Sequence, residues 1–175
     1  VVDRAGDELV GGLGNTGDGR TVSADTPFVI GSTSKSFTAL AVMQLVDDGR
    51  VELDAPVRRY VPELELPSPG AADAITVRQI LQQTSGLPET AGGPVLKSAQ
   101  DGTALDAVRE LRDTPLAGAP GREWHYSNAN YVLAGLVVER AAGTTYADHV
   151  ERRIFTPLGM TGSTTGPATG QRSGG

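Results

Sequence analysis

The apolar run over residues 33–48 constrains the fold of this chain more than any other segment. Its apolar residues occupy more than one face of an α-helix, which is typical of a helix buried nearly all round. They are Phe37, Leu40, Ala41, Val42, Met43, Leu45 and Val46. Gly49 follows them and predicts the end of the helix. A chain of 175 residues, 38% of them hydrophobic, is long enough to build one domain around such a helix.

The residues before this helix have strand character, and those after it are mainly helical. Residues 1–13 predict a hairpin with its turn at 3–7, and residues 28–30 predict a short strand end that Gly31 turns into the helix. The other predicted helices cover residues 57–60, 76–81, 104–112, 131–142 and 146–155. The main predicted loops are residues 15–25, 89–102 and 117–121. Without βαβ alternation, this order predicts an α+β fold with a helical lobe and part of an antiparallel sheet.

Composition excludes several classes of function. The net charge of −6 is scattered and no basic stripe exists, so a nucleic-acid partner is not expected. The chain has no cysteine, and its two histidines, His125 and His149, stand far apart, so we expect no disulfide and no metal site. No stretch approaches the roughly 18 apolar residues of a membrane span.

Ser32 and Lys35 lie three residues apart at the start of the apolar helix. This spacing puts both side chains on one helical face. A serine hydroxyl becomes a nucleophile when a base takes its proton, and a lysine can be that base where burial favours the neutral amine. The helix N-terminus would also stabilise negative charge on the serine oxygen. Taken alone, the spacing favours a plainer alternative, in which Ser32 caps the helix and Lys35 reaches water.

Tyr126 and Asn128 change that balance because they follow a Gly/Pro loop and precede a predicted helix. A tyrosine beside an ammonium group is shifted toward phenolate and can shuttle protons. The Asn128 amide could hold a substrate carbonyl or the lysine. The alternative is that Tyr126 packs in the core with Trp124 and that Asn128 caps the next helix.

Seven short stretches in a fixed order resemble the penicillin-recognising serine enzymes. They are FVIGSTSKSF at 28–37, LVDDGRVELD at 45–54, ITVRQIL at 75–81, TSGLP at 84–88, PG at 120–121, YSN at 126–128 and IFTPLGM at 154–160. More narrowly, the chain is similar to class C β-lactamases, D-alanyl-D-alanine carboxypeptidases and related esterases.

This resemblance implies roles for four residues. Ser32 would be the acylated nucleophile, Lys35 would assist proton transfer, Tyr126 would be the general base and acid, and Asn128 would contact substrate. Which of Lys35 and Tyr126 takes the serine proton stays open. The resemblance implies no metal and no organic cofactor.

The sequence departs from the family pattern at the third motif, Lys/His-x-Gly. None of the lysines or histidines, Lys35, Lys97, His125 and His149, has a glycine two residues further on. We therefore expect residues 1–175 to be an incomplete β-lactamase-like domain, with a sheet edge and loop at 1–31, a mainly helical lobe at 32–160 and a flexible tail at 161–175. A smaller departure is Gln82-Gln83, where the family often has a histidine before Thr-Ser-Gly.

The resemblance predicts a serine hydrolase that forms an acyl-enzyme with a D-Ala-D-Ala peptide, a β-lactam or an ester. The flanks of the Ser32 and Thr76 segments favour the carboxypeptidase or general hydrolase branch. One alternative is a non-catalytic module that binds penicillin or a peptide. Another is an assembly in which a second chain or segment completes the sheet. The family also implies an extracytoplasmic or secreted location.

Overall fold

The computed structural model describes residues 10–94, 97 and 103–166, and this part of the chain is predominantly helical. Its α-helices are α1 (Ser34–Asp47), α2 (Ala71–Ala74), α3 (Val77–Leu81), α5 (Ala104–Arg109), α6 (Asn128–Ala142) and α7 (Tyr146–Val150). The 3₁₀ turns are η1 (Gly31–Thr33), η2 (Val57–Arg59), η3 (Glu89–Ala91) and η4 (Glu110–Asp113), and η5 (Glu151–Phe155) is a π-helical turn that continues α7.

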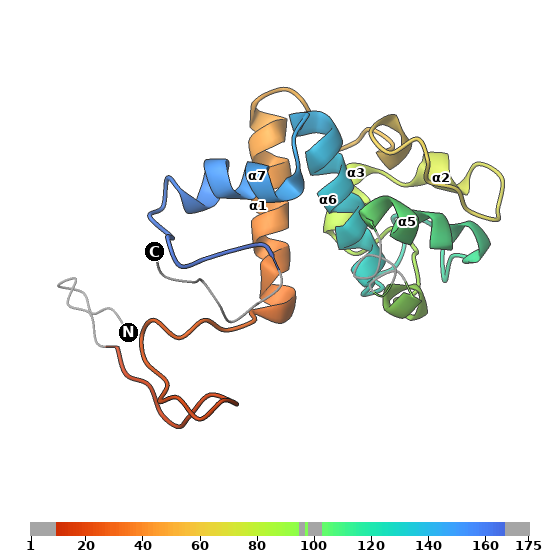
Figure 1. Ribbon diagram of the computed structural model, residues 1–175. Coiled ribbons are helices and arrows are strands. Elements are labelled where there is room, and N and C mark those ends of the chain that lie inside the picture. The colour runs from red at the N-terminus through yellow and green to blue at the C-terminus, as the bar shows by residue number, and fades with distance from the viewer. Residues whose placement is uncertain (1–9, 95–96, 98–102, 167–175) are drawn as a thin grey trace.

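Helix α6 is the centre of the core. It packs against α1, α3, α5 and α7, and Figure 1 shows it between α1 on one side and α3 and α5 on the other. Its buried residues include Leu133, Leu136 and Val137, together with the polar Asn130. Leu45 of α1, Ile80 of α3, Leu111 of η4 and Ile154 of η5 belong to the same buried cluster. The helices therefore share one hydrophobic core, which fixes their mutual positions.

Helix α1 is less buried than its sequence predicts. Thr38, Ala41, Val42 and Leu45 are buried where α6 and α7 cover the helix. Leu40 and Met43, in contrast, are 43% and 44% exposed. The expectation of burial nearly all round is therefore wrong for the part of the chain that the structure describes, because no described element packs on that side of α1.

The sheet predicted from the sequence is not found in the described ranges. They contain no strand, only the isolated bridges Asn15–Thr21 and Pro56–Thr76. Residues 28–30, predicted as a strand end, are exposed and form no strand. A strand needs a neighbour that accepts and donates its backbone hydrogen bonds, and no described segment supplies one here. Most of the predicted hairpin at 1–13 and most of the predicted tail at 161–175 lie outside the described residues.

The predicted helices are confirmed within a few residues. Thr76 caps α3 as expected, and it forms a capping box with Gln79 in which each side chain accepts from the other residue's backbone N–H. Helix α6 begins three residues before the predicted start at 131. The predicted loop at 89–102 is wrong in its first part, because η3 and residues 92–94 are helical, and its later residues lie largely outside the described part.

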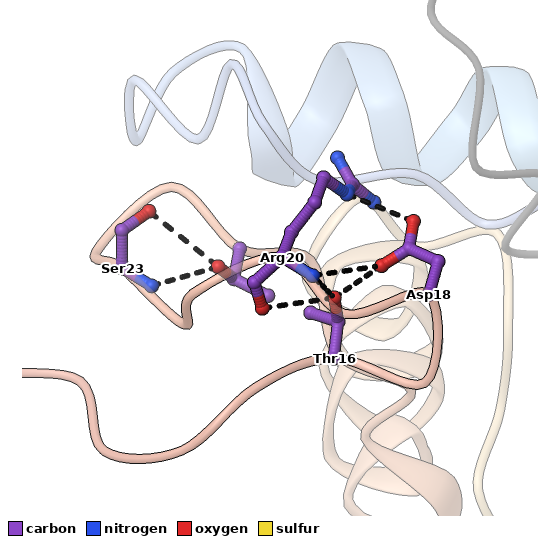
Figure 2. Close-up of polar contacts among 5 residues, drawn as sticks. Thr16, Asp18, Arg20 and Ser23 are labelled. Atoms are coloured by element: carbon purple, nitrogen blue, oxygen red, sulfur yellow. Dashed lines mark hydrogen bonds and ion pairs between the residues drawn. The ribbon is translucent and has the colours of Figure 1, made fainter.

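Residues 10–30 run away from the helices and are held by contacts of their own (Figure 1). In Figure 2, Arg20 donates its backbone N–H to Thr16 Oγ1 at 3.1 Å and its Nε to Asp18 Oδ2 at 2.8 Å. Ser23 N–H donates to Thr26 Oγ1 at 2.9 Å. The hydrogen bond from the Thr16 hydroxyl, helped by Arg20, lowers the pKa of Asp18. The predicted loop at 15–25 is thus an ordered polar turn without a core contribution.

Candidate active site

Ser32 and Lys35 are presented by the start of α1. Gly31 has a φ of +52°, a left-handed conformation that glycine adopts without strain, and the chain turns there into η1. Ser32 lies in η1 and is exposed, whereas Lys35 lies in the first turn of α1 and is half-buried. Lys35 Nζ donates a hydrogen bond to Ser32 Oγ at 3.0 Å. The predicted pairing of these two side chains on one face is therefore present.

Tyr126, just before α6, and Asn128, at its start, contact Ser32 and Lys35 where α6 packs against α1. The Tyr126 hydroxyl lies 2.8 Å from Ser32 Oγ. Asn128, the first residue of α6, accepts hydrogen bonds at Oδ1 from Lys35 Nζ at 2.7 Å and from Tyr126 OH at 3.2 Å. The four predicted side chains therefore form one closed hydrogen-bonded group, although 90 or more residues separate its halves in sequence.

The structural alternatives for these residues do not describe the molecule. Helix α1 has no side-chain cap, so Ser32 does not serve as one. Ser127 occupies the N-cap position of α6, and Asn128 uses its amide oxygen for Lys35 and Tyr126 instead. Trp124 is 65% exposed, so no core packing unites it with Tyr126. What remains for all four residues is a polar cluster at the surface.

The electrostatics of the cluster favour negative charge on Tyr126. Lys35 Nζ lies 5.1 Å from the centre of the Tyr126 ring and 5.6 Å from that of Tyr131. The hydrogen bond with Lys35, followed by that with Ser32, lowers the pKa of the Tyr126 phenol. Burial raises the pKa of Tyr131, whose hydroxyl donates to the Leu81 carbonyl at 3.1 Å. The pKa values of the two neighbouring phenols are thus shifted in opposite directions, and Tyr126, whose pKa is lowered, is the one that contacts Ser32.

The comparisons with known proteins agree with this geometry. The family model described as Beta-lactamase matches residues 1–175. The chain belongs to the beta-lactamase family.

Relatives of this beta-lactamase family chain include hydrolases with different names. Esterase EstB of Burkholderia gladioli is 39% identical over 161 residues, which cover 85% of this chain and 41% of the relative. A D-stereospecific amidohydrolase from Streptomyces sp. superimposes with a TM-score of 0.65 at 35% identity, over 75% of this chain and 42% of that one.

The octameric penicillin-binding protein homologue of Pyrococcus abyssi superimposes with a TM-score of 0.71 at 30% identity, over 82% of this chain and 34% of that one. The beta-lactamase/transpeptidase-like fold is therefore shown. The chain spans less than half the length of each of these relatives.

A set of buried polar side chains, which the sequence did not predict, lies close to the site of this beta-lactamase family chain. Gln83, Ser85 and Asn130 are all buried and hydrogen-bonded to one another in a row. The only signal in the sequence was the polar pair Gln82-Gln83 where the family often has histidine. No spacing rule connects it with Asn130, because that contact joins α6 to the end of α3.

Two further findings concern what else the chain could hold. Nowhere in residues 10–94, 97 and 103–166 do three or more metal-binding side chains come together. Over the same ranges, no helix is both long and apolar enough to cross a membrane.

Proposed function

We propose that this chain carries the nucleophile of a serine hydrolase that acts through an acyl-enzyme on an amide or an ester. The observation that carries the proposal is the placement of Ser32 Oγ, 2.8 Å from Tyr126 OH and 3.0 Å from Lys35 Nζ. A serine with two such neighbours has a proton acceptor and a cation within hydrogen-bond distance. The exposure of Ser32 leaves its oxygen open to a substrate carbonyl.

In the first half of the reaction, Tyr126 takes the proton of Ser32 while Ser32 Oγ bonds to the carbonyl carbon. The lowered pKa of Tyr126 supports it as the acceptor. The tetrahedral intermediate then collapses, the bond to the leaving nitrogen or oxygen breaks, and Tyr126 returns the proton to that leaving group. An ester between Ser32 and the acyl group remains, and water hydrolyses it in the second half.

Lys35 and Asn128 support this transfer without forming a covalent bond. Lys35 donates to Ser32 Oγ and Asn128 Oδ1, so it stabilises the phenolate of Tyr126 and the attacking oxygen. Asn128 orients Lys35 and leaves its amide N–H₂ for a substrate carbonyl. The backbone N–H of Ser32, at the start of the helix, would be one donor to the oxyanion.

The names of the relatives support a substrate that carries an acyl group, as an amide or as an ester. Their names cover a D-stereospecific amidohydrolase, an esterase and a penicillin-binding protein homologue. We propose that this chain is acylated by a D-amino-acid amide or peptide, a β-lactam or an ester. Acylation is the step that these substrates share, so it is the step to test.

A second candidate is a module that binds penicillin or a peptide without turnover. The Lys/His-x-Gly motif, which binds the substrate carboxylate in the resembling enzymes, separates the two candidates. Its presence on a strand beside Ser32 would favour the hydrolase, and its replacement would favour the binding module. A third candidate is an assembly in which a second chain or segment completes the sheet. The octameric relative of Pyrococcus abyssi supports this third candidate.

The deciding experiment is intact-mass analysis after incubation with a fluorescent penicillin and, separately, with an activated ester. We expect one acyl adduct on the wild type and none on Ser32→Ala. Ser34→Ala is the matched control, because Ser34 is also exposed at the start of α1, and its adduct should persist. An adduct on Ser32→Ala would overturn the assignment of the nucleophile. No adduct on any protein, with binding of penicillin still measurable, would favour the second candidate.

A further inference from the structure

Gln83 has an unusual backbone conformation for its residue type. It follows α3 with a φ of +60°, and no other residue except glycine has a positive φ in the part of the chain that the structure describes. Its side chain is polar and yet only 7% of the residue is exposed. A left-handed conformation is unfavourable for glutamine, so the surrounding contacts must hold it in place.

The contacts of Gln83 bracket Tyr126. The main-chain carbonyl of Gln83 accepts from His125 N–H at 2.8 Å, on the residue before the tyrosine. Its Oε1 accepts from Ser127 N–H at 2.9 Å, on the residue after it. The same Oε1 accepts from Asn130 Nδ2 at 2.7 Å, in the first turn of α6. One residue thus holds the backbone on both sides of Tyr126 and the helix that follows.

The neighbours of Gln83 extend this attachment along the loop. The Asn130 amide oxygen accepts from Ser85 Oγ at 2.6 Å. The carbonyls of Thr84 and Gly86 accept from Gly121 N–H at 2.7 Å and Ala117 N–H at 2.8 Å. Gly86 has a φ of +83°, and a Cβ there would lie 2.3 Å from the Gly118 carbonyl oxygen, so only glycine allows this approach. Hydrogen bonds to the segment 83–86 therefore hold the loop 117–127 at several points along its length.

We propose that Gln83 is a positioning residue, which holds the backbone around Tyr126 so that the phenol meets Ser32 and Lys35. Both N–H groups that flank Tyr126 donate to Gln83, and these bonds restrain the backbone that carries the phenol. Gln83 acts through Tyr126, while Ser32 is placed by η1 and Lys35 by α1. This inference rests on the proposed function for its effect on acylation, but not for its effect on the position of Tyr126.

The position of Tyr126 has a readout that needs no substrate. The contacts with Lys35 and Ser32 lower the pKa of its phenol, so displacement of the ring returns that pKa toward its ordinary value near 10. Ionisation of tyrosine is measured by ultraviolet absorbance near 295 nm, a wavelength at which phenolate absorbs. The chain has four tyrosines, and the difference between wild type and Tyr126→Phe isolates the transition of Tyr126.

The variants to titrate are Gln83→Ala, Gln83→Gly and Gln82→Ala. Gln83→Gly removes both side-chain hydrogen bonds yet accepts the left-handed backbone without strain, so it remains informative if Gln83→Ala does not fold. Gln82→Ala is the matched control, since Gln82 is also a glutamine, immediately precedes Gln83 and is exposed. Circular dichroism establishes that each variant retains its helices.

In folded Gln83→Gly we expect the Tyr126 transition to move to higher pH, with the rising limb of the acylation rate moving in the same direction. Acylation at neutral pH should fall on the order of 10- to 100-fold, as a misplaced catalytic group would cause. Gln82→Ala should match the wild type in both measurements. An unchanged Tyr126 transition in folded Gln83→Gly would overturn the positioning role. Absence of acylation in the wild type would overturn the proposed function instead, and the titration would still decide the role of Gln83.

Discussion

The two halves of the site are built in different ways. Ser32 and Lys35 are set by η1 and α1, where helical hydrogen bonds between near neighbours fix the backbone. Tyr126 lies in a loop whose backbone is bound to residues more than 30 positions away, through Gln83 and Thr84. Both halves deliver a side chain to the same oxygen, yet one relies on regular secondary structure and the other on buried polar contacts.

Because of this difference, each half is sensitive to a different kind of substitution. In the helical half, substitution of Ser32 or Lys35 should lower the acylation rate without altering stability, because the hydrogen bonds of the helix do not involve these side chains. The loop half should also change when a buried polar partner is removed, because an unsatisfied buried donor or acceptor is expensive and the loop can move to satisfy it.

The largest effect is expected for Lys35→Met in the helical half. The change removes the hydrogen bonds to Ser32 and Asn128 and the cation that stabilises the Tyr126 phenolate. The acylation rate should fall about 10²- to 10⁴-fold while the thermal midpoint hardly changes, as stopped-time mass spectrometry and circular dichroism will measure. Lys97→Met, at the other lysine of the sequence, is the control and should acylate normally. Equal losses in both variants would contradict the assignment.

Tyr126→Phe should lower the acylation rate about 10²- to 10³-fold, since it removes the proton acceptor but keeps the ring. On the proposed mechanism the active form is the phenolate, so the wild-type rate should rise with pH through the lowered pKa of Tyr126. This rising limb should be absent from the Tyr126→Phe profile. Tyr60→Phe is the control, because the Tyr60 hydroxyl accepts from the Glu52 N–H and belongs to no contact of the Ser32 cluster in the described residues. A Tyr126→Phe profile that kept the limb would assign it to another group.

Asn130→Ala tests the buried support of the loop half. It leaves the Ser85 hydroxyl without its acceptor and deprives Gln83 Oε1 of one donor, in a region where all three residues are buried. The free energy of unfolding should fall by about 1–3 kcal/mol, measured by urea denaturation. Ser36→Ala, an exposed change on α1, should stay within about 0.5 kcal/mol of the wild type. The contrast between the halves fails if both variants are equally stable.

Acid should weaken the packing around α7 through His149. This histidine is 5% exposed, and burial is the main cause that lowers its pKa, with Arg153, Arg50 and Arg152 acting the same way and Asp48 against them. The unfolded chain therefore binds the proton more readily, so stability is full above the ordinary pKa of 6.5 and falls as pH drops toward the folded value.

Urea denaturation from pH 7.5 to pH 5 should show this fall in the wild type and a flatter profile in His149→Leu. His125→Gln, in the loop half, serves as the comparison at the other histidine. The assignment to His149 would be wrong if His125→Gln flattened the profile and His149→Leu did not.

The smallest effect is a spectroscopic one at Trp124, the single tryptophan of the sequence. It is 65% exposed, and its ring centre lies 6.3 Å from that of Tyr126. An acyl group on Ser32 should alter the solvent around this ring and shift its fluorescence slightly. The same reagent added to Ser32→Ala should leave the emission unchanged, and an equal shift there would mean that the signal reports reagent binding away from Ser32.

Much of the helical half could be predicted from the sequence. The spacing of Ser32 and Lys35, the cap at Thr76 and the end of α1 before Gly49 all depend on residues within one or two turns of each other. Local hydrogen bonds and steric preferences act at that range, so a sequence pattern expresses them directly. The order of the short family stretches added Tyr126 and Asn128 as candidates, which the geometry then brought to Ser32.

Other features could not be predicted, since they depend on what lies opposite in space. Helical periodicity indicates that Leu40 and Met43 lie on apolar faces of α1, but only the packing decides which face is covered. In the described structure, α6 and α7 cover a different face. The strand predicted at 28–30 likewise depends on a partner strand, which local propensity does not provide.

By itself, the sequence determined the helices, the family and the identity of the four polar residues at the site. The tertiary structure alone decided that Ser32 meets Tyr126 across 94 positions and that Gln83 holds the tyrosine loop from beneath. For Gln83 the physical reason is the cost of burying a polar group, which a partner at hydrogen-bond distance offsets, whereas Ser32 meets Tyr126 because α1 packs against α6. The packing of α1, α3 and α6 determines which partner each polar group meets, and the local sequence around Gln83 does not predict it.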